Sequence, residues 1–445
     1  MAPPDRFGTQ GECLDSRSPV GFHYTPAPSH RRRESAVSAT PFDFNAMLRS
    51  DLPPPAARFT GFPQFNFVGG HNDEGSVPVD DLIEAAGRVL RREGRTLATY
   101  GMQSGPLGYR PLRDFIVRKL AKDAGITCTA DEVLITSGSL QGLDLVNAAV
   151  VAPGDTVIVE EMTYGGAISR LKRAGANIVG VPVDHDGLSA EKLSSALDDL
   201  AARGVRAKYI YTIPTVQNPT ATVMSDSRRR ETIALSEKHG VPIFEDECYS
   251  DLVWTGERPA ALYSMVADDR VVHIGSFSKS IAPALRIGYL VAKWPLMSRI
   301  LPLKTDGGTP ALDQMVLAEY CQDHFDDHIV PLRQTLRRKL VVMMEALRER
   351  FGDEVEFDDP VGGIFLWMKL PAPVDTSRLE QLATRSGVTI NPGAEWMTDA
   401  VGGRQRLRLC FAHPSEEVIR AGVAQLAEIC HREFGVPKRD PGLHR

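Results

Sequence analysis

Residues 271–289 read VVHIGSFSKSIAPALRIGY, and this stretch gives the first indication of the ligand that the chain binds. It begins as a short apolar run of β type, passes through Gly275 and a pair of serines, presents Lys279, and turns at Pro283 toward Arg286. Hydroxyls and a guanidinium suit a phosphate, because they donate hydrogen bonds and the guanidinium has a fixed charge. A lysine among them suits an aldehyde, because an amine with a lowered pKa forms a Schiff base. Alone, the stretch is compatible with a phosphate site or with a surface loop.

A ligand that has both a phosphate and an aldehyde is pyridoxal phosphate, which is the hypothesis for this stretch. The composition of the chain is consistent with a large protein that binds such a small molecule. The chain has 445 residues, 42% of them hydrophobic, which is enough for more than one structural unit. A net charge of −6 argues against nucleic acid as the main partner, and no apolar stretch is long enough to span a bilayer. Six scattered cysteines without a C-x-x-C pair predict reduced thiols and a cytoplasmic location.

Four segments are expected along the chain. Residues 1–55 are rich in proline, serine and charge, which predicts a poorly ordered N-terminal arm. Residues 56–95 form an entry segment, helical from 79 to 93, that is expected to pack with a small domain. Residues 96–310 are expected to form a large ligand-binding domain and residues 311–445 a small α+β domain. Whether the arm is a solvated tail or folds over the site or a partner subunit is left open.

Within the expected large domain, short apolar runs alternate with helical segments. The runs expected as strands are 133–136, 156–160, 177–181, 207–213, 241–246 and 271–274. This alternation predicts an α/β fold with a mainly parallel sheet covered by helices on both faces. Ligands of such sheets bind beyond the carboxyl ends of the strands, and the polar clusters of this chain follow strands.

Several candidate site residues stand at those strand ends. Ser139 lies at a strand-to-helix turn, where free amide groups and the helix dipole favour an anion. Tyr164 could stack on a flat ring, and Asn218 could donate to a phenolate-like oxygen. Asp246 could keep a pyridine nitrogen protonated, with Tyr249 near the ring oxygen. Each also has an ordinary structural explanation, namely an N-cap, a core tyrosine, an Asn-Pro turn or a solvated loop. A metal site is not expected, because no histidine or second acidic cluster pairs with the acids.

Arg408 lies between two leucines in an expected strand, 406–411, of the small domain. Its guanidinium could hold a substrate carboxylate in a bidentate fork. A half-exposed strand arginine is the alternative interpretation.

Together, these motifs resemble those of the class I/II aminotransferases, which are pyridoxal phosphate enzymes of the aspartate aminotransferase fold (fold type I). The chain is most similar to the branch that includes 2-aminoadipate and kynurenine aminotransferases. The matching stretches are TSGSLQ (136–141), QNPT (217–220), DECY (246–249), SFSK (276–279), APALRIG (282–288), PVGGIFLW (360–367), PG (392–393) and RLCF (408–411). They follow the family's order over roughly residues 95–430, and the ordered set is far more specific than any one motif.

The resemblance implies a three-layer large domain with a seven-stranded, mainly parallel sheet, a smaller α+β C-terminal domain, and pyridoxal phosphate as cofactor. It implies that Lys279 holds the cofactor as a Schiff base and later moves the proton. The other cofactor contacts it implies are Asp246 at the pyridine nitrogen, Tyr164 on the ring face, Tyr249 and Asn218 at the ring oxygen, and Ser139, Leu140, Ser276, Ser278 and Arg286 at the phosphate. Arg408, with Asn218, is implied to bind the substrate. Tyr100 resembles the tyrosine that reaches the neighbouring subunit's phosphate site, which implies a homodimer with shared active sites.

The chain departs from the family pattern at three places. The segment between Tyr100 and Gly108 is longer than the usual motif, and Ala221 stands where the family commonly has glycine. Residues 69–74, GGHNDE, differ from the usual Gly-x-Pro stretch, which lines the substrate pocket in relatives. The identity of the substrate side chain is therefore left open.

The resemblance implies an aminotransferase that moves an amino group from an amino acid to a 2-oxo acid. The first alternative is an enzyme of the same fold that performs elimination, replacement, cyclisation or decarboxylation in a biosynthetic pathway, because this fold fixes the cofactor better than the reaction. The second is a transcription regulator with an aminotransferase-like domain. Residues 1–55 are too short and too rich in proline to form the winged helix of such a regulator.

Overall fold

The computed structural model describes residues 42–50, 52, 55–56 and 58–437. Most of the expected arm, residues 1–55, lies outside them. The chain divides into two compact units, residues 1–60 and 61–445. In the first unit a short 3-10 helix spans Phe44–Met47, and its N-cap Asp43 accepts a hydrogen bond from the Asn45 amide at 2.9 Å.

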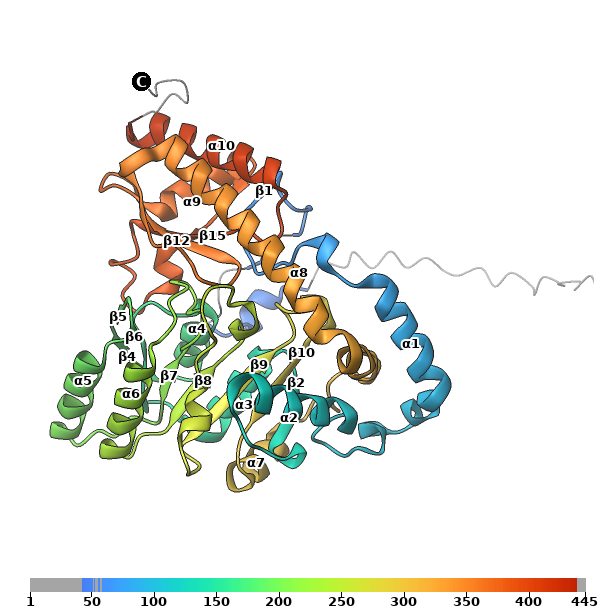
Figure 1. Ribbon diagram of the computed structural model, residues 1–445. Coiled ribbons are helices and arrows are strands. Elements are labelled where there is room, and N and C mark those ends of the chain that lie inside the picture. The colour runs from blue at the N-terminus through green and yellow to red at the C-terminus, as the bar shows by residue number, and fades with distance from the viewer. Residues whose placement is uncertain (1–41, 51, 53–54, 57, 438–445) are drawn as a thin grey trace, which may run out of the picture. The chain divides into compact units, whose positions relative to one another are not determined.

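The centre of the second unit is a seven-stranded sheet with strand order β2-β10-β9-β8-β7-β3-β4 (Figure 1). The strands are β2 (Val133–Ser137), β3 (Thr156–Glu160), β4 (Asn177–Val181), β7 (Ile210–Thr212), β8 (Ile243–Asp246), β9 (Val271–Ser276) and β10 (Ile287–Val291). β10 is antiparallel to both of its neighbours, and the other pairs are parallel. The predicted seven-stranded, mainly parallel sheet is confirmed. β10 was not among the expected strands.

Helices cover both faces of this sheet. They are α2 (Arg110–Ala124), α3 (Ser139–Val150), α4 (Gly165–Arg173), α5 (Ala190–Ala202), α6 (Asp226–His239) and α7 (Trp294–Ile300). In β2, Val133 and Ile135 belong to one apolar cluster while Leu134 belongs to another. Since successive strand residues point to opposite faces, these two clusters are the two interfaces of a three-layer arrangement. The predicted α/β fold class is therefore confirmed.

The C-terminal part forms a second sheet with strand order β11-β12-β15-β14. Its strands are β11 (Glu356–Phe357), β12 (Phe365–Lys369), β14 (Asn391–Pro392) and β15 (Arg406–Cys410), and its helices are α9 (Thr376–Arg385) and α10 (Glu416–Phe434). The entry segment contributes β1 (Phe65–Asn66), which pairs in parallel with β13 (Val388–Thr389). A hairpin, β5 (Val183–Asp184) and β6 (Gly187–Leu188), follows β4.

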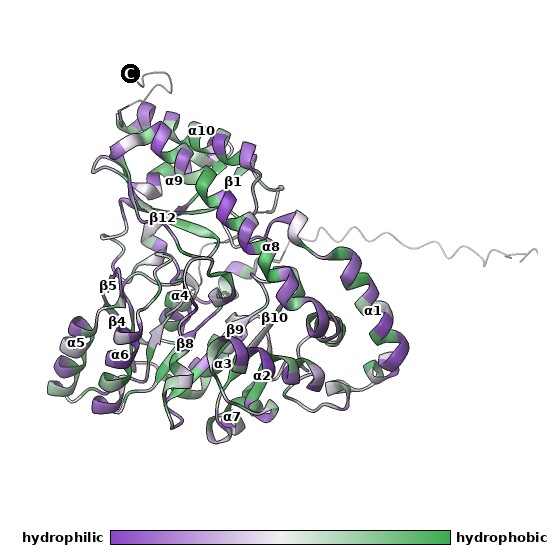
Figure 2. Cartoon of the chain, viewed as in Figure 1, coloured by the Kyte–Doolittle hydropathy of each residue, from purple (hydrophilic) through white to green (hydrophobic). Residues whose placement is uncertain are grey.

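Two long helices complete the second unit, α1 (Val79–Glu93) and α8 (Ala311–Phe351), and they pack on each other. Figure 2 shows that α1, α8 and α10 alternate hydrophilic and hydrophobic residues, the pattern of helices with one buried and one solvent-facing side. Among the described residues, no helix combines the length and apolar character that a bilayer crossing needs.

Candidate active site

A cavity of about 320 Å³ opens where β2, β8 and β9 end. It is lined by Gly69, Gly70, Ser139, Leu140, Tyr164, Ile213, Asn218, Asp246, Cys248, Tyr249, Ser276, Ser278, Lys279, Arg286, Asn391, Trp396 and Arg408. Every candidate residue from the sequence except Tyr100 is therefore brought to one cavity. Its place beyond the carboxyl ends of the strands is the place where parallel sheets bind ligands.

Lys279 points its amine into this cavity. The Nζ atom donates a hydrogen bond to the Gly70 carbonyl at 2.5 Å, and a Cβ atom at Gly70 would overlap it. Burial lowers the pKa of Lys279, and the positive charges of Arg408 and Arg286 act in the same direction. A lowered pKa raises the share of neutral amine, which is the nucleophilic and basic form.

The N-terminus of α3 forms one end of the cavity. The helix begins at Ser139, and its N-cap Gly138 has φ 77° and no side chain to cap the first amides. Those amides and the helix dipole favour an anion. A Cβ atom at Gly138 would lie 2.5 Å from Arg286 Nη2, so only glycine lets the guanidinium approach the helix end this closely.

Arg286 stands beside that helix end with no carboxylate partner among the described residues. Its two terminal nitrogens donate to the Pro283 and Ser137 carbonyls, each at 3.2 Å. Ser278 and Ser276 lie on the same side, and the Ser278 amide donates to Ser276 Oγ at 3.1 Å. Helix amides, hydroxyls and an uncompensated guanidinium together fit a phosphate group.

Asp246 also lines the cavity as the last residue of β8, and it is buried. Burial raises the pKa of its carboxyl, and hydrogen bonds from Cys248 and Tyr211 oppose that shift. The Tyr211 hydroxyl donates to Oδ2 at 2.7 Å, and the Cys248 amide donates to Oδ1 at 3.2 Å. A buried carboxylate held in this way fits the protonated nitrogen of a pyridine ring.

Asn218 connects the two sides of the cavity. Its Nδ2 donates to the Tyr249 hydroxyl at 3.3 Å, and its Oδ1 accepts from Arg408 Nη1 at 3.0 Å. The side-chain amide of Asn218 therefore links Tyr249 to Arg408.

Arg408 is a buried cation without an acidic partner among the described residues. Its Nη2 donates to the Gly69 carbonyl at 3.0 Å and to Asn391 Oδ1 at 2.9 Å, and its guanidinium lies 3.7 Å from the centre of the Trp396 ring. Burial lowers its pKa, and its Nε atom is buried without a hydrogen-bond partner. A buried guanidinium with a free donor fits the carboxylate of a ligand.

Tyr100 does not line this cavity. It belongs to a 3-10 helix, Tyr100–Gln103, and the residue is 94% exposed and lines a separate hollow of about 790 Å³. Its predicted contact with a neighbouring subunit stays a prediction.

Sequence reasoning missed several lining residues, chiefly Asn391, Trp396 and Cys248. Asn391 and Trp396 flank the PG motif at 392–393, and Cys248 lies inside the DECY motif, so the motifs marked the segments but not these side chains. The Trp396 and Tyr164 rings are 5.9 Å apart, which makes part of the cavity aromatic.

Residues 64–426 match the family model for aminotransferase class I and II. The chain belongs to this family. It is therefore a pyridoxal phosphate-dependent aminotransferase, and it moves an amino group from an amino acid to a 2-oxo acid.

Individual relatives agree with this assignment. The 2-aminoadipate transaminase of Thermus thermophilus is 31% identical, over 81% of this chain and 88% of that protein. The crystal structure of the multiple substrate aminotransferase of Thermococcus profundus matches with a TM-score of 0.81 and 29% identity. The match covers 88% of this chain and 100% of that chain. The Pyrococcus horikoshii kynurenine aminotransferase has a TM-score of 0.79 and 28% identity, over 84% and 92% of the two chains. The predicted family and branch are confirmed.

Some relatives are named as HTH-type transcriptional regulators, and this chain covers 70% and 79% of the length of two of them. These names describe the relatives and are not carried over to this chain. The family match and the aminotransferase relatives favour amino-group transfer over both alternatives that the sequence left open.

Ala221, which stands where the family commonly has glycine, is buried and has φ 61°, in the left-handed region. We predict that Ala221→Val lowers the free energy of unfolding by about 2–4 kcal/mol, because a β-branched residue is strained there and its extra methyl groups overpack the site. Urea denaturation measures this loss. The matched change Ala201→Val, at an exposed position in α5, should cost less than about 1 kcal/mol. Equal losses at the two sites would contradict the prediction.

Proposed function

We propose that Lys279 is the residue of this aminotransferase that binds the cofactor covalently and moves the proton at the substrate carbon. The observation that supports the proposal most strongly is its buried amine, which has a lowered pKa and shares one cavity with the N-terminus of α3 and the carboxylate of Asp246. A nucleophile and base with those neighbours suits a phosphorylated pyridine aldehyde.

Pyridoxal phosphate supplies an aldehyde carbon that accepts amino groups and a protonated ring that withdraws electrons. In the proposal, Asp246 keeps the ring nitrogen protonated, because its buried carboxylate favours a positive charge beside it. Tyr164 covers the ring face, and Asn218 and Tyr249 hold the ring oxygen. The phosphate group is held by the amides of Ser139 and Leu140, the hydroxyls of Ser276 and Ser278, and the guanidinium of Arg286.

Arg408 and Asn218 are proposed to bind the substrate's α-carboxylate. Two terminal nitrogens of Arg408 are already fixed by Asn218 and Asn391, so the guanidinium is held in one orientation before substrate arrives. Prior orientation lowers the entropy cost of binding. Lys279, as a free amine, would then remove the proton from the substrate's α-carbon and hold it as an ammonium group.

The assembly is proposed to be a homodimer in which Tyr100 reaches the partner's phosphate site. The exposure of Tyr100 supports this, as do the exposed apolar residues Val79, Ile83 and Leu312 on helices α1 and α8. A cytoplasmic location belongs to the same proposal, and it is supported by five free cysteines in the described part of the chain.

Reduction of the yellow holoenzyme with borohydride is predicted to fix the cofactor at Lys279, because only a covalently bound carbon–nitrogen double bond is trapped in this way. Peptide mass spectrometry after digestion locates the label. Lys293, which pairs with Glu132 at 3.1 Å outside the cavity, serves as an internal control and should stay unlabelled. A label on any other lysine would refute the proposal.

A further inference from the structure

The turn that presents Asn218 follows β7 and is held from both sides. β7 lies between β3 and β8 in the sheet. Each of these neighbours provides a buried glutamate at or just after its carboxyl end, Glu160 from β3 and Glu247 after β8. Neither glutamate lines the cavity.

Glu160 holds the side of the turn next to β3. Its Oε1 accepts hydrogen bonds from Thr212 Oγ1 at 2.6 Å and the Ile213 amide at 3.1 Å, and its Oε2 accepts from Gln217 Nε2 at 2.9 Å. Burial raises the pKa of Glu160 to about 7, and these three donors favour the ionised form. Gln217 is the residue before Asn218, so the carboxylate fixes the backbone from which Asn218 projects.

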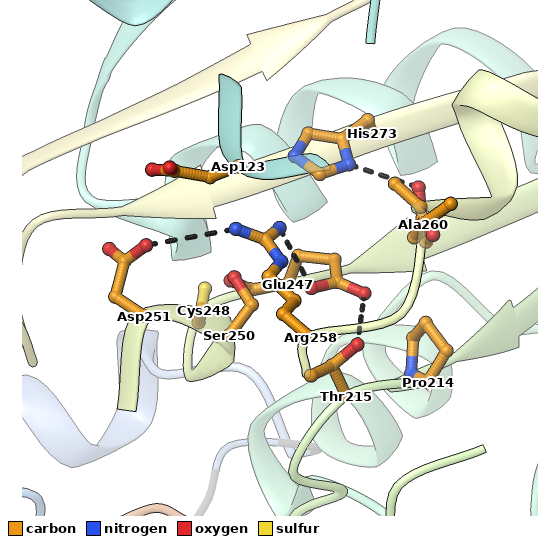
Figure 3. Close-up of polar contacts among 12 residues, drawn as sticks. Asp123, Pro214, Thr215, Glu247, Cys248, Ser250, Asp251, Arg258, Ala260 and His273 are labelled. Carbon is orange, nitrogen blue, oxygen red and sulfur yellow. Dashed lines mark hydrogen bonds and ion pairs between the residues drawn. The ribbon is translucent and has the colours of Figure 1, made fainter. Parts of the chain in front are cut away.

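Glu247 holds the side of the turn next to β8. Its Oε1 accepts from Thr215 Oγ1 at 2.7 Å, and its Oε2 accepts from Arg258 Nη2 at 3.2 Å (Figure 3). Only 1% of the Glu247 side chain is exposed. Glu247 also lies between Asp246 and Cys248 in the chain, so its side chain connects the Asn218 turn to the end of β8 at Asp246 and to the segment that carries Tyr249.

A compensated charge network surrounds Glu247. Arg229 is fully buried, donates to Thr215 Oγ1 at 2.9 Å, and lies 3.8 Å from Glu247 Oε1. Arg258 also faces Asp251, at 3.8 Å. Neutralising Glu247 would leave both arginines short of a negative charge in a buried setting, which is costly.

We propose that Glu160 and Glu247 are positioning residues that clamp Thr215 and Gln217 and thereby set the place of Asn218 between Arg408 and Tyr249. The inference rests on the role proposed above for Asn218. Glu247 binds the side chain of Thr215 and Glu160 binds that of Gln217. Glu160 ends β3 and Glu247 directly follows β8, the two strands on either side of β7. Loss of the hydrogen bonds from either glutamate is therefore expected to move Asn218 relative to both the cofactor and the substrate carboxylate.

The test compares three clamp variants, Glu160→Gln, Glu247→Gln and Thr215→Val. In Glu160→Gln, the new side-chain NH₂ group faces either Gln217 Nε2 or the Ile213 amide. Both of these groups are donors, so one of the hydrogen bonds to residue 160 is lost in either orientation. Thr215→Val removes one hydroxyl and keeps the pairing of Glu247 with Arg258, so it tests the clamp even if a glutamate variant does not fold. The dissociation constant of pyridoxal phosphate from the apoenzyme is measured by quenching of tryptophan fluorescence, since Trp396 lines the cavity. The KM of the best amino donor is measured in parallel.

Each glutamate variant is expected to raise both constants by about tenfold, and Thr215→Val by a smaller factor. Leu426→Ala, on the buried side of α10, is the control for general destabilisation, since it should lower the Tm and leave both constants unchanged. Asn218→Ala distinguishes failure of the clamp from failure of the role proposed for Asn218. If it raises both constants while the clamp variants stay within about twofold of wild type, the clamp is refuted and the role of Asn218 stands. If Asn218→Ala also changes neither constant, the proposed role of Asn218 fails and the clamp fails with it.

Discussion

Replacing Lys279 by alanine is expected to lower turnover by about a thousandfold or more, because one change removes both the nucleophile and the base. The fold should survive. The Lys279 amine is buried with a lowered pKa, and it donates a hydrogen bond to the Gly70 carbonyl. Steady-state turnover of wild type and variant, each saturated with pyridoxal phosphate, measures the loss.

Two comparisons make that result specific to Lys279. Lys293→Ala removes a lysine that pairs with Glu132 outside the cavity, and it should keep turnover near the wild-type value. Added methylamine should restore part of the lost turnover in Lys279→Ala, because a small amine can enter the vacated space and act as a base. Turnover close to wild type in Lys279→Ala would remove this residue from the chemistry.

The cavity was predictable from sequence because of the physics of parallel sheets. Strands that run in one direction bring their carboxyl ends to one edge, so motifs that follow different strands meet there. Ser139, Asp246 and Lys279 are far apart in the chain, yet all of them line the same cavity. Their residue types then indicated a phosphate, a ring nitrogen and an aldehyde.

Other features could not be read from the sequence, because their partners come from distant segments. The DECY acids were compatible with a solvated loop, and the fully buried Arg229 that approaches Glu247 belongs to helix α6. β10 was missed because its first residues read as the continuation of a turn, and only pairing with β2 and β9 makes them a strand. Trp396 lines the cavity through tertiary packing with Tyr164 and Arg408, which no local pattern encodes.

Arg408→Ala is expected to weaken binding of the amino donor by about 2–5 kcal/mol, the range for removing one partner of a buried charge pair. The effect should appear mainly as a raised KM, because the carboxylate is bound in the same way before and during proton transfer. The guanidinium has no acidic partner among the described residues, so the protein itself loses no salt bridge in the variant. Steady-state kinetics with a range of amino donors measures the change.

Arg408→Lys distinguishes loss of charge from loss of geometry. A lysine keeps the positive charge but cannot donate in a fork, and it cannot stack on Trp396 as the guanidinium does at 3.7 Å. The lysine variant should therefore fall between alanine and wild type if a bidentate contact holds the carboxylate. An unchanged KM together with an intact kcat in Arg408→Ala would exclude Arg408 from substrate binding. The buried Arg408 Nε, which has no hydrogen-bond partner, would then be expected to bind another ligand. A buried donor without an acceptor costs free energy, and most buried polar groups in proteins are hydrogen-bonded.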